Sequence, residues 1–500
     1  AGSVERPSVR MGFLTLEIMI ALVLVTLSIS AVVLVTFGNQ ALLVGGETNA
    51  EATQKAEEIL ETAQSLARQD FHTLNPRATS TTGIYRSSLS VELLSPLDYF
   101  SKKITAYVAW TDERHIPHEV SLTSIMTDFL NATGGDTCSS VVIGNWLNPQ
   151  VASAMNDLGT IPGIPPGTYT VGDIDAYKEK LYVAVSKTTS ANHPTLFIFD
   201  VSNPASLTLL GATDTAPTLG GINGIRVAPD VTTGKLYAYL ASSGLSRQLQ
   251  VIDVSNPAAL SSSFIKNYKI PGVTSAGDGN SLYYRNGYVY LGLTATGGNG
   301  PVFHVVDVHD PTNPSLVGSR SIGGDSNDVN VIRVKNTYAY LASPYNDELV
   351  VLDIASSTSP MLIGNFSSST GNGRSLALVG NHAYFGTTRA GTPELYALDI
   401  AVPTHLVSTD SEEIGASING LIVRDKLAFL LLKAGGSNDG KLQIWNVSDP
   451  SNLTIEAMSA LALPSGGTTH YSLDCEGNIL YAGTNAVGDT GAISVIIPSP

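Results

Sequence analysis

Hydrophobic residues form one long uninterrupted run near the start of the sequence. Residues 18–37 carry no charged side chain, and about 20 apolar residues suffice to cross a bilayer as a helix. From 47 to 68 the apolar residues instead recur every three to four positions among strong helix formers, which is typical of an amphipathic helix. Together these patterns predict one long N-terminal helix over 13–70, with 13–37 in a membrane or a filament core.

Alternating apolar and polar residues follow this segment and mark two short strands, 103–112 and 119–126, spaced as a hairpin. They predict a small β domain over 71–136. His115 and His118 in the turn have a spacing that suits a metal ion, but no fourth ligand is evident. We interpret them as part of a solvated turn and predict no metal site.

The remaining two-thirds of the chain repeats a pattern of short apolar strands about every 50 residues, a period typical of propellers. The strand at 181–185 returns at 236–240, and each such strand is followed by another apolar run. Seven copies of this pattern predict a seven-bladed β-propeller over 137–500. In six of the copies the second run ends on an acid or amide, at Asp200, Asp253, Asp307, Asp353, Asp399 and Asn446.

These six residues occur once per blade, and each stands directly before a turn. Asp and Asn side chains in such positions hydrogen-bond the backbone of the turn. We therefore interpret them as structural, and not as catalytic groups or calcium ligands. The sequence also has no nucleophile elbow and no phosphate-binding loop, so we predict no catalytic residues and no cofactor.

Counting strands reveals one gap in the predicted ring. Seven first, second and third strands are present, but a fourth strand follows only six of them. An open blade would leave unpaired edges, which ring closure normally removes. Residues 142–146 closely resemble the fourth strand at 362–366, so we predict that 139–146 completes the seventh blade.

Two cysteines flank this predicted closure. Cys138 directly precedes the added strand, and Cys475 ends the first strand of the same blade. An even number of cysteines in an exported chain favours a disulfide. The two positions share one face of the ring but lie three strand spacings apart, on the order of 14 Å. A Cys138–Cys475 disulfide therefore requires the loop before Cys138 to reach inward.

The charge of the chain narrows its possible partners. Forty-three acidic residues against 27 basic ones give a net charge of −16 and a pI near 4.9. Nucleic-acid binding needs a basic patch, and the sequence has none. An acidic surface of this kind suits an exposed extracellular body, and we predict no nucleic-acid partner.

A short motif precedes the apolar run: Gly12, the aromatic Phe13, and Glu17 as a lone acid at the rim of the apolar segment. It resembles the processing site of type IV prepilins and pseudopilins. The resemblance implies a leader at 1–12, cleavage between Gly12 and Phe13, and N-methylation of Phe13. It also implies assembly through a charge pair between Glu17 of one subunit and the new amino group of Phe13 of the next. In a secretory signal peptide the cleavage site would instead follow the apolar stretch.

The repeats in turn resemble the LVIVD repeat, a β-propeller blade unit. The two resemblances together imply the fold class: a long N-terminal α-helix with a small α+β pilin-like head, followed by an all-β seven-bladed propeller. They predict a non-enzymatic subunit of a type IV pilus-type filament that displays the propeller on the surface or tip for adhesion or interaction. Two alternatives stay open: a minor pseudopilin of a type II-like secretion system whose propeller contacts cargo, and a surface-anchored propeller enzyme.

The same resemblance sets the expected partners and location. The partners are copies of the chain or other pilins through the N-terminal helix, a prepilin peptidase, and a surface ligand of unknown identity. The chain is expected in the inner membrane before assembly and afterwards in an extracellular filament or at the cell surface.

Overall fold

The computed structural model divides into two compact units, Ala1–Asp128 and Phe129–Pro500, which are considered separately below. It describes residues 22, 26–27, 48–67, 74, 76–95, 98–112, 114–127, 137–138, 142–188, 193–215, 220–230, 233–244, 246–262, 265–273, 277–294, 300–323, 328–343, 348–368, 371–388, 393–433, 439–467 and 471–499.

The first unit combines a helix over 48–67 with one antiparallel sheet of four strands in sequence order. The expected hairpin strands lie in β3 and β4, which pair with Ala109 opposite Glu119. The strands are β1 (Arg77–Thr82), β2 (Tyr85–Ser95), β3 (Asp98–Thr111) and β4 (Pro117–Thr127).

Alanines make the contact between this helix and its sheet. Ala52, Ala56 and Ala63 are buried in one cluster with sheet residues that include Ile104 and Trp110. Their spacing of four and seven places them on one face of the helix. Small side chains let the helix backbone come close to the sheet, while the charged residues of the same segment stay on the solvent side.

The predicted fold class is wrong in its N-terminal part. The described chain is nearly all β, its one continuous α-helix covers only 48–67, and no long helix with a pilin-like head is found. The expectation joined an apolar and an amphipathic segment across Gly38, Gly45 and Gly46, and glycine has a low helix propensity. Within the described ranges, no helix is both long enough and apolar enough to cross a membrane.

The second unit is a β-propeller of seven sheets, or blades, whose strands pair antiparallel except for one short parallel pairing in the seventh blade. Each of the first six blades is built from four consecutive strands. In order they are β7 (Tyr169–Ala176), β8 (Lys180–Thr188), β9 (Leu196–Asp200) and β10 (Thr208–Thr213); β11 (Ile222–Pro229), β12 (Leu236–Ser242), β13 (Leu249–Asp253) and β14 (Ile265–Tyr268); β15 (Gly279–Arg285), β16 (Tyr288–Leu293), β17 (Phe303–Asp307) and β18 (Ser315–Arg320); β19 (Val331–Lys335), β20 (Tyr338–Ala342), β21 (Leu349–Asp353) and β22 (Met361–Phe366); β23 (Gly373–Val379), β24 (His382–Thr387), β25 (Leu395–Asp399) and β26 (Val407–Glu412); β27 (Ser417–Arg424), β28 (Leu427–Lys433), β29 (Lys441–Asn446) and β30 (Thr454–Ala462). Two short 3₁₀ helices, η2 (Leu158–Thr160) and η3 (Pro257–Ser262), lie between strands.

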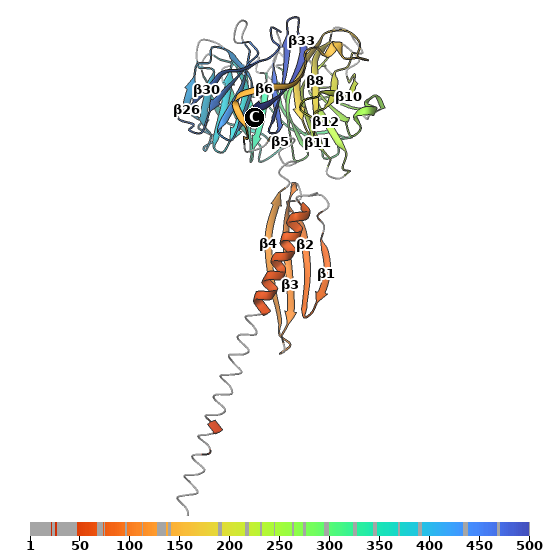
Figure 1. Cartoon of the computed structure of the whole chain (residues 1–500), viewed down its shortest axis with the longest axis vertical. Coiled ribbons are helices and arrows are strands. Elements are labelled where there is room, and N and C mark those ends of the chain that lie inside the picture. Colours follow the sequence, from red (N-terminus) through yellow and green to blue (C-terminus); the bar gives the residue numbers. More distant parts are fainter. Residues whose placement is uncertain are drawn as a thin grey trace, which may run out of the picture. The chain divides into compact units, whose positions relative to one another are not determined.

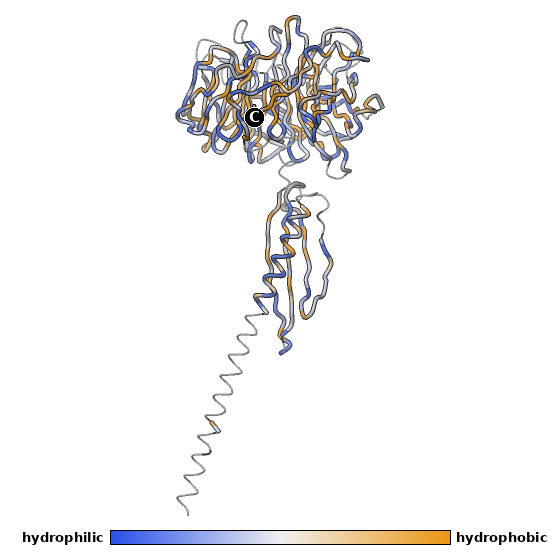
Figure 2. Tube along the Cα trace, in the orientation of Figure 1, coloured by the Kyte–Doolittle hydropathy of each residue, from blue (hydrophilic) through white to orange (hydrophobic). Residues whose placement is uncertain are grey.

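The ring closes through the first strands of the blades. Each first strand contacts the first strand of the next blade, and β31 of the seventh blade contacts β7 of the first. The middle strands are buried on both faces because every blade is sandwiched between two others; Leu196, Phe197, Ile198 and Phe199 of β9 are all fully buried. This explains why these strands read as continuous apolar runs in the sequence. Figure 2 shows orange, hydrophobic stretches running through the propeller.

The seventh blade is assembled from two distant parts of the chain. Strands β31 (Ser472–Gly477), β32 (Ile479–Ala486) and β33 (Thr490–Ser499) come from its end. They are completed by β6 (Asn145–Met155), which pairs antiparallel with β33, and by β5 (Thr137–Cys138), which pairs parallel with β31. In Figure 1 β6 is drawn in orange-yellow beside the dark blue β33.

The closing strand differs in position from the expected 139–146, with which it shares only Asn145 and Trp146. The prediction relied on the likeness of 142–146 to 362–366, which locates the start of β6 and not its length. As an outermost strand, β6 is largely exposed and has no clear apolar alternation, and Pro149 within it lacks a backbone donor. Because of these features, the length of β6 could not be predicted from the sequence.

Candidate functional site

At the centre of the propeller, the described residues enclose a cavity of about 400 Å³ and another of about 350 Å³. We call the larger the Asn compartment, since its lining includes Asn223, Asn280, Asn330 and Asn419. The smaller is the Asp compartment, lined in part by Asp175 and Asp474. Both are walled by Arg226, Arg333, Leu376, Leu421 and Leu473, so these five residues form the waist between the two cavities.

Asparagines in the larger compartment bind each blade to the next. The side-chain amide of Asn223 donates to Gly279 O at 2.8 Å, that of Asn280 to Val329 O at 3.0 Å, and that of Asn330 to Gly373 O at 2.7 Å. Each amide reaches the backbone of the following blade in the same sense around the ring. The wall of this compartment is therefore rigid and polar before any ligand arrives.

The asparagine positions are set by irregularities in the inner strands. Asn223, Asn280 and Asn419 each fall at a register shift in the pairing of a first strand with its second strand, and Arg374 occupies the same place in the fifth blade. A β-bulge redirects a side chain that regular pairing would hold elsewhere. In the fifth blade this redirection brings a guanidinium, instead of an amide, to the lining.

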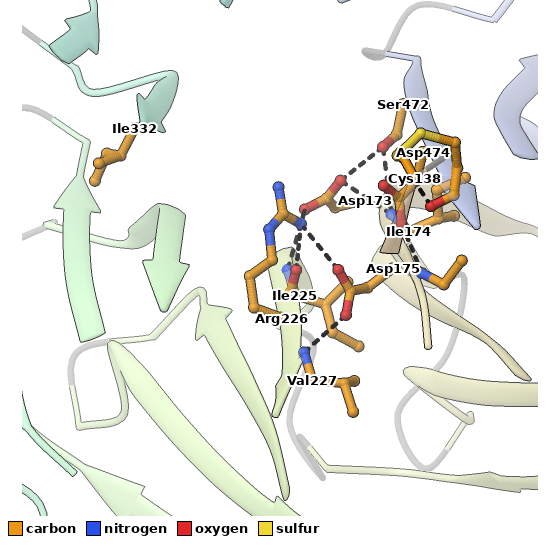
Figure 3. Close-up of polar contacts among 12 residues, drawn as sticks. Cys138, Asp173, Ile174, Asp175, Ile225, Arg226, Val227, Ile332, Ser472 and Asp474 are labelled. Atoms are coloured by element: carbon orange, nitrogen blue, oxygen red, sulfur yellow. Dashed lines mark hydrogen bonds and ion pairs between the residues drawn. A yellow bond between two sulfur atoms is a disulfide. The ribbon is translucent and has the colours of Figure 1, made fainter. Parts of the chain in front are cut away.

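A charged cluster joins the first blade to its two neighbours (Figure 3). Arg226 Nη1 lies 3.1 Å from Asp173 Oδ2 and 3.7 Å from Asp175 Oδ1. The carboxylates also accept backbone N–H groups of the next blade, Asp175 from Val227 at 2.8 Å and Asp474 from Ala176 at 2.6 Å. The cluster thus uses its carboxylate oxygens for contacts between blades.

Burial and neighbouring charges shift the acidity of this cluster. Burial raises the pKa of Asp175 well above its ordinary value; Arg226 opposes the rise, and Asp474 adds to it. Burial alone would lower the pKa of Arg226, but the carboxylates of Asp173 and Asp175 outweigh it and the pKa is raised. Arg226 therefore stays charged, and the cluster is held together by a cation among acids.

Cys138 and Cys475 form a disulfide at the Asp compartment, with their Cα atoms 5.1 Å apart. This separation is well below the expected three strand spacings because Thr137 and Cys138 form β5, directly beside β31. The bond links residues 337 positions apart in sequence. It ties the chain just ahead of β6 to the innermost strand of the closing blade.

The six acids and amides that end the third strands all make the same turn contact. In each, a side-chain oxygen accepts the backbone N–H two residues later, at 2.8–3.0 Å. At Asp200, hydrogen bonds from the hydroxyl and backbone N–H of Ser202 lower the pKa of the carboxyl. The six residues are Asp200, Asp253, Asp307, Asp353, Asp399 and Asn446. They are distributed one to a blade, and none lines either compartment.

The remaining predicted site residues, Gly12, Phe13 and Glu17, lie outside the described residues. Among the described residues, no cluster of three or more His, Cys, Asp or Glu side chains is arranged to hold a metal ion. The sequence did not lead us to the charged groups that line the Asn and Asp compartments, which together we call the channel. Their signal was a charged residue inside an otherwise apolar first strand, as at Asp175 and Arg226.

Comparison with known proteins supports the propeller. Residues 171–215, 226–267, 276–321 and 323–368 match the LVIVD repeat, which confirms that part of the predicted resemblance. No curated protein matches the sequence. None of these comparisons gives evidence for the pilin resemblance.

Two solved structures are among those that align with this chain. The structure of YCF48 bound to D1 peptide aligns with a TM-score of 0.43 and 8% identity, covering 69% of this chain and 97% of its own. The periplasmic gluconolactonase PpgL of Pseudomonas aeruginosa aligns with a TM-score of 0.42 and 10% identity, covering 74% and 96% respectively.

Proposed function

We propose that this chain is a subunit of a type IV pilus-type filament that displays its propeller at the surface for adhesion or another interaction. One observation carries the proposal: Glu17 stands at the rim of a long apolar run, five residues after Gly12. A carboxylate is costly beside hydrocarbon, so its presence implies a partner charge. The amino group of Phe13, freed by cleavage after Gly12, would be that charge in a neighbouring subunit.

The propeller supports the second half of the proposal, that the displayed part binds and does not catalyse. It is a closed scaffold whose channel has a fixed polar wall, and rigid scaffolds commonly carry binding sites. The acidic groups in the channel accept backbone N–H groups of adjacent blades. These contacts give them a structural use, and we assign them no part in catalysis.

The test is to express the full chain with a prepilin peptidase and examine sheared surface fractions by electron microscopy and N-terminal sequencing. We expect a mature chain that starts at Phe13 and is incorporated into filaments. The Glu17→Ala variant should be cleaved but not incorporated, because it lacks the charge that pairs with Phe13.

The matched control is Glu57→Ala, since Glu57 is an exposed acid on the described helix and should be dispensable for assembly. An uncut chain in filaments, or normal incorporation of Glu17→Ala, would refute the proposal.

A further inference from the structure

We propose that the sheet of the first unit has a self-complementary face through which two copies of this chain pair face to face. The helix over 48–67 packs against one face of this sheet (Figure 1). We call the opposite face, which carries Arg86, Glu92, Lys103 and Glu119, the open face. The inference goes beyond assembly through the N-terminal segment and rests on the proposed function only for its setting, in which paired copies join two neighbouring filaments.

Alternation along the strands decides which side chains lie on the open face. Alternate residues of β2, β3 and β4 pack toward the helix, among them Leu89, Ile104 and Leu122. Because successive residues of a strand point to opposite sides of a sheet, the residues between them lie on the open face. Four exposed charged residues are in this second set: Arg86, Glu92, Lys103 and Glu119.

The four charges stand at the two ends of the open face. At one end, Arg86 and Glu119 lie on either side of Ala109. At the other end, Glu92 lies directly opposite Lys103 and accepts a hydrogen bond from Ser90 at 3.2 Å. The sign of the charge along β2 thus runs from positive to negative, and along the neighbouring strands it runs the other way.

This pattern is complementary to itself when one copy is turned end for end. With β3 antiparallel over β3 of a second copy, Arg86 comes over Glu92 of that copy. Lys103 then comes over Ala109 of that copy, beside its Glu119. With β3 parallel over β3, Lys103 would meet its own counterpart, and like charges in contact are unfavourable. The charges therefore select the antiparallel arrangement, in which the same surface serves both copies.

The middle of the open face suits a close contact. It is built from small hydroxyl side chains around the exposed Tyr107, and the hydroxyls of Thr105 and Thr123 lie 3.2 Å apart. Tyrosine is enriched in the cores of protein interfaces. The four charges of the face cancel, whereas the whole chain carries −16, so two copies repel each other least when they meet here.

The size of the face sets the strength of the contact. From Lys103 to Ala109 the strand spans roughly 20 Å, and β2 to β4 span roughly 10 Å across the strands. This area is below that of a stable interface, so we expect weak pairing between single copies. Alignment of many copies along two filaments would strengthen it through multivalency.

The experiment is carbodiimide cross-linking of the full chain in detergent, which joins an amine directly to a touching carboxylate, followed by mass spectrometry. Within one copy, Lys103 and Glu119 lie on neighbouring strands but six residues out of register, roughly 20 Å apart. An amide between these two residues therefore reports a contact between copies, and we expect it in a dimer. The amide between Lys103 and Glu92, which lie directly opposite within one copy, is the internal positive control.

Arg86→Glu should reduce the Lys103–Glu119 amide about tenfold or more, because it sets two acids against each other at both ends of the pair. Adding Glu92→Arg to that variant exchanges the two charges and should restore the amide. The matched control is Arg77→Glu, since Arg77 is an exposed arginine on the edge strand β1, and it should leave the amide unchanged.

Three results would overturn the inference: formation of the control amide without the Lys103–Glu119 amide, failure of the charge exchange to restore it, or a dimer in which Lys103 is joined instead to Glu57 of the helix. Assembly is scored separately by electron microscopy. Glu17→Ala should keep the cross-link, and Arg86→Glu should enter filaments that no longer associate side by side. A cross-link without filaments would therefore count against the proposed function alone.

Discussion

The third and seventh blades are each packed between two neighbouring blades, but one is built from a continuous segment of the chain and the other from two distant segments. The third blade is continuous in sequence from β15 to β18, and it is joined to the fourth by neutral hydrogen bonds from Asn280 and Ser281 to Val329 O. The seventh blade takes strands from two ends of the propeller. A disulfide lies within it, and at its junction with the first blade Asp474 accepts the Ala176 N–H while Ser472 donates to Asp173.

This difference shows where the fold needs reinforcement. Consecutive strands in a meander are kept together by short turns, so closing each pair costs little chain entropy. The strand pairs β33–β6 and β31–β5 join segments more than 300 residues apart, and no short turn assists them. A disulfide within the seventh blade, together with carboxylate hydrogen bonds across its junction with the first blade, supplies there what connectivity supplies in the other six blades.

The largest test of this comparison is Arg226→Met. Arg226 reaches from β11 of the second blade to Asp173 and Asp175 of the first, beside the seam, and its removal leaves both acids without this cation. Because the pair is partly buried, the cost should lie below the roughly 3–5 kcal/mol of a fully buried pair. We expect a marked fall in the thermal unfolding midpoint, measured by scanning calorimetry, and partial recovery in Arg226→Lys. Arg285→Met in the third blade removes a half-buried arginine that donates to Asn336 O at 3.0 Å, and it should change stability less because this contact is to a neutral carbonyl. Equal losses in both variants would end the distinction between the charged cluster beside the seam and a contact between two ordinary blades.

Removing the disulfide should have the next largest effect. In Cys138→Ser with Cys475→Ser, the constraint on the unfolded chain is lost, at a cost of about 2–5 kcal/mol. Denaturant unfolding of the full chain with and without reductant measures it: reduced wild type and the double variant should coincide. If oxidised and reduced wild type unfold at the same denaturant concentration, closure does not depend on this bond.

The smallest expected effect belongs to a turn that recurs in the ordinary blades. Asp399→Ala removes the acceptor for the Ala401 N–H, which lies 2.8 Å away, and should cost about 1 kcal/mol. Asp399→Asn is the matched control, because Asn446 makes the same contact at 2.9 Å in the sixth blade. The thermal unfolding midpoint of Asp399→Asn should equal that of the wild type, and the midpoint of Asp399→Ala should be lower. A loss with Asn as large as with Ala would show that charge, and not the turn bond, matters.

The repeated part of the fold was predictable because its signal is local. Apolar second and third strands, and a turn residue such as Asp253, recur in each blade and can be aligned without knowing the structure. The long N-terminal helix predicted over 13–70 is contradicted, since the one continuous α-helix among the described residues covers 48–67.

The channel could not be predicted by the same means. Asp173 and Arg226 are 53 positions apart, and Ser472 bonds Asp173 from the far end of the sequence. Only the order of blades around a closed ring brings such residues together. Likewise, the bulges that turn Asn223 and Arg374 toward the lining depend on pairing register, which the pattern of apolar residues does not specify.

The order of features along the closing segment has a mechanical consequence. A pulling force applied to the chain ahead of residue 137 meets Cys138 before it meets β6. Through the disulfide, that load passes covalently to Cys475 at the inner edge of the blade. Strand β6 is thereby shielded from being peeled off β33 one hydrogen bond at a time. The disulfide thus carries the load in place of the hydrogen bonds between β33 and β6, and the seventh blade stays closed under tension.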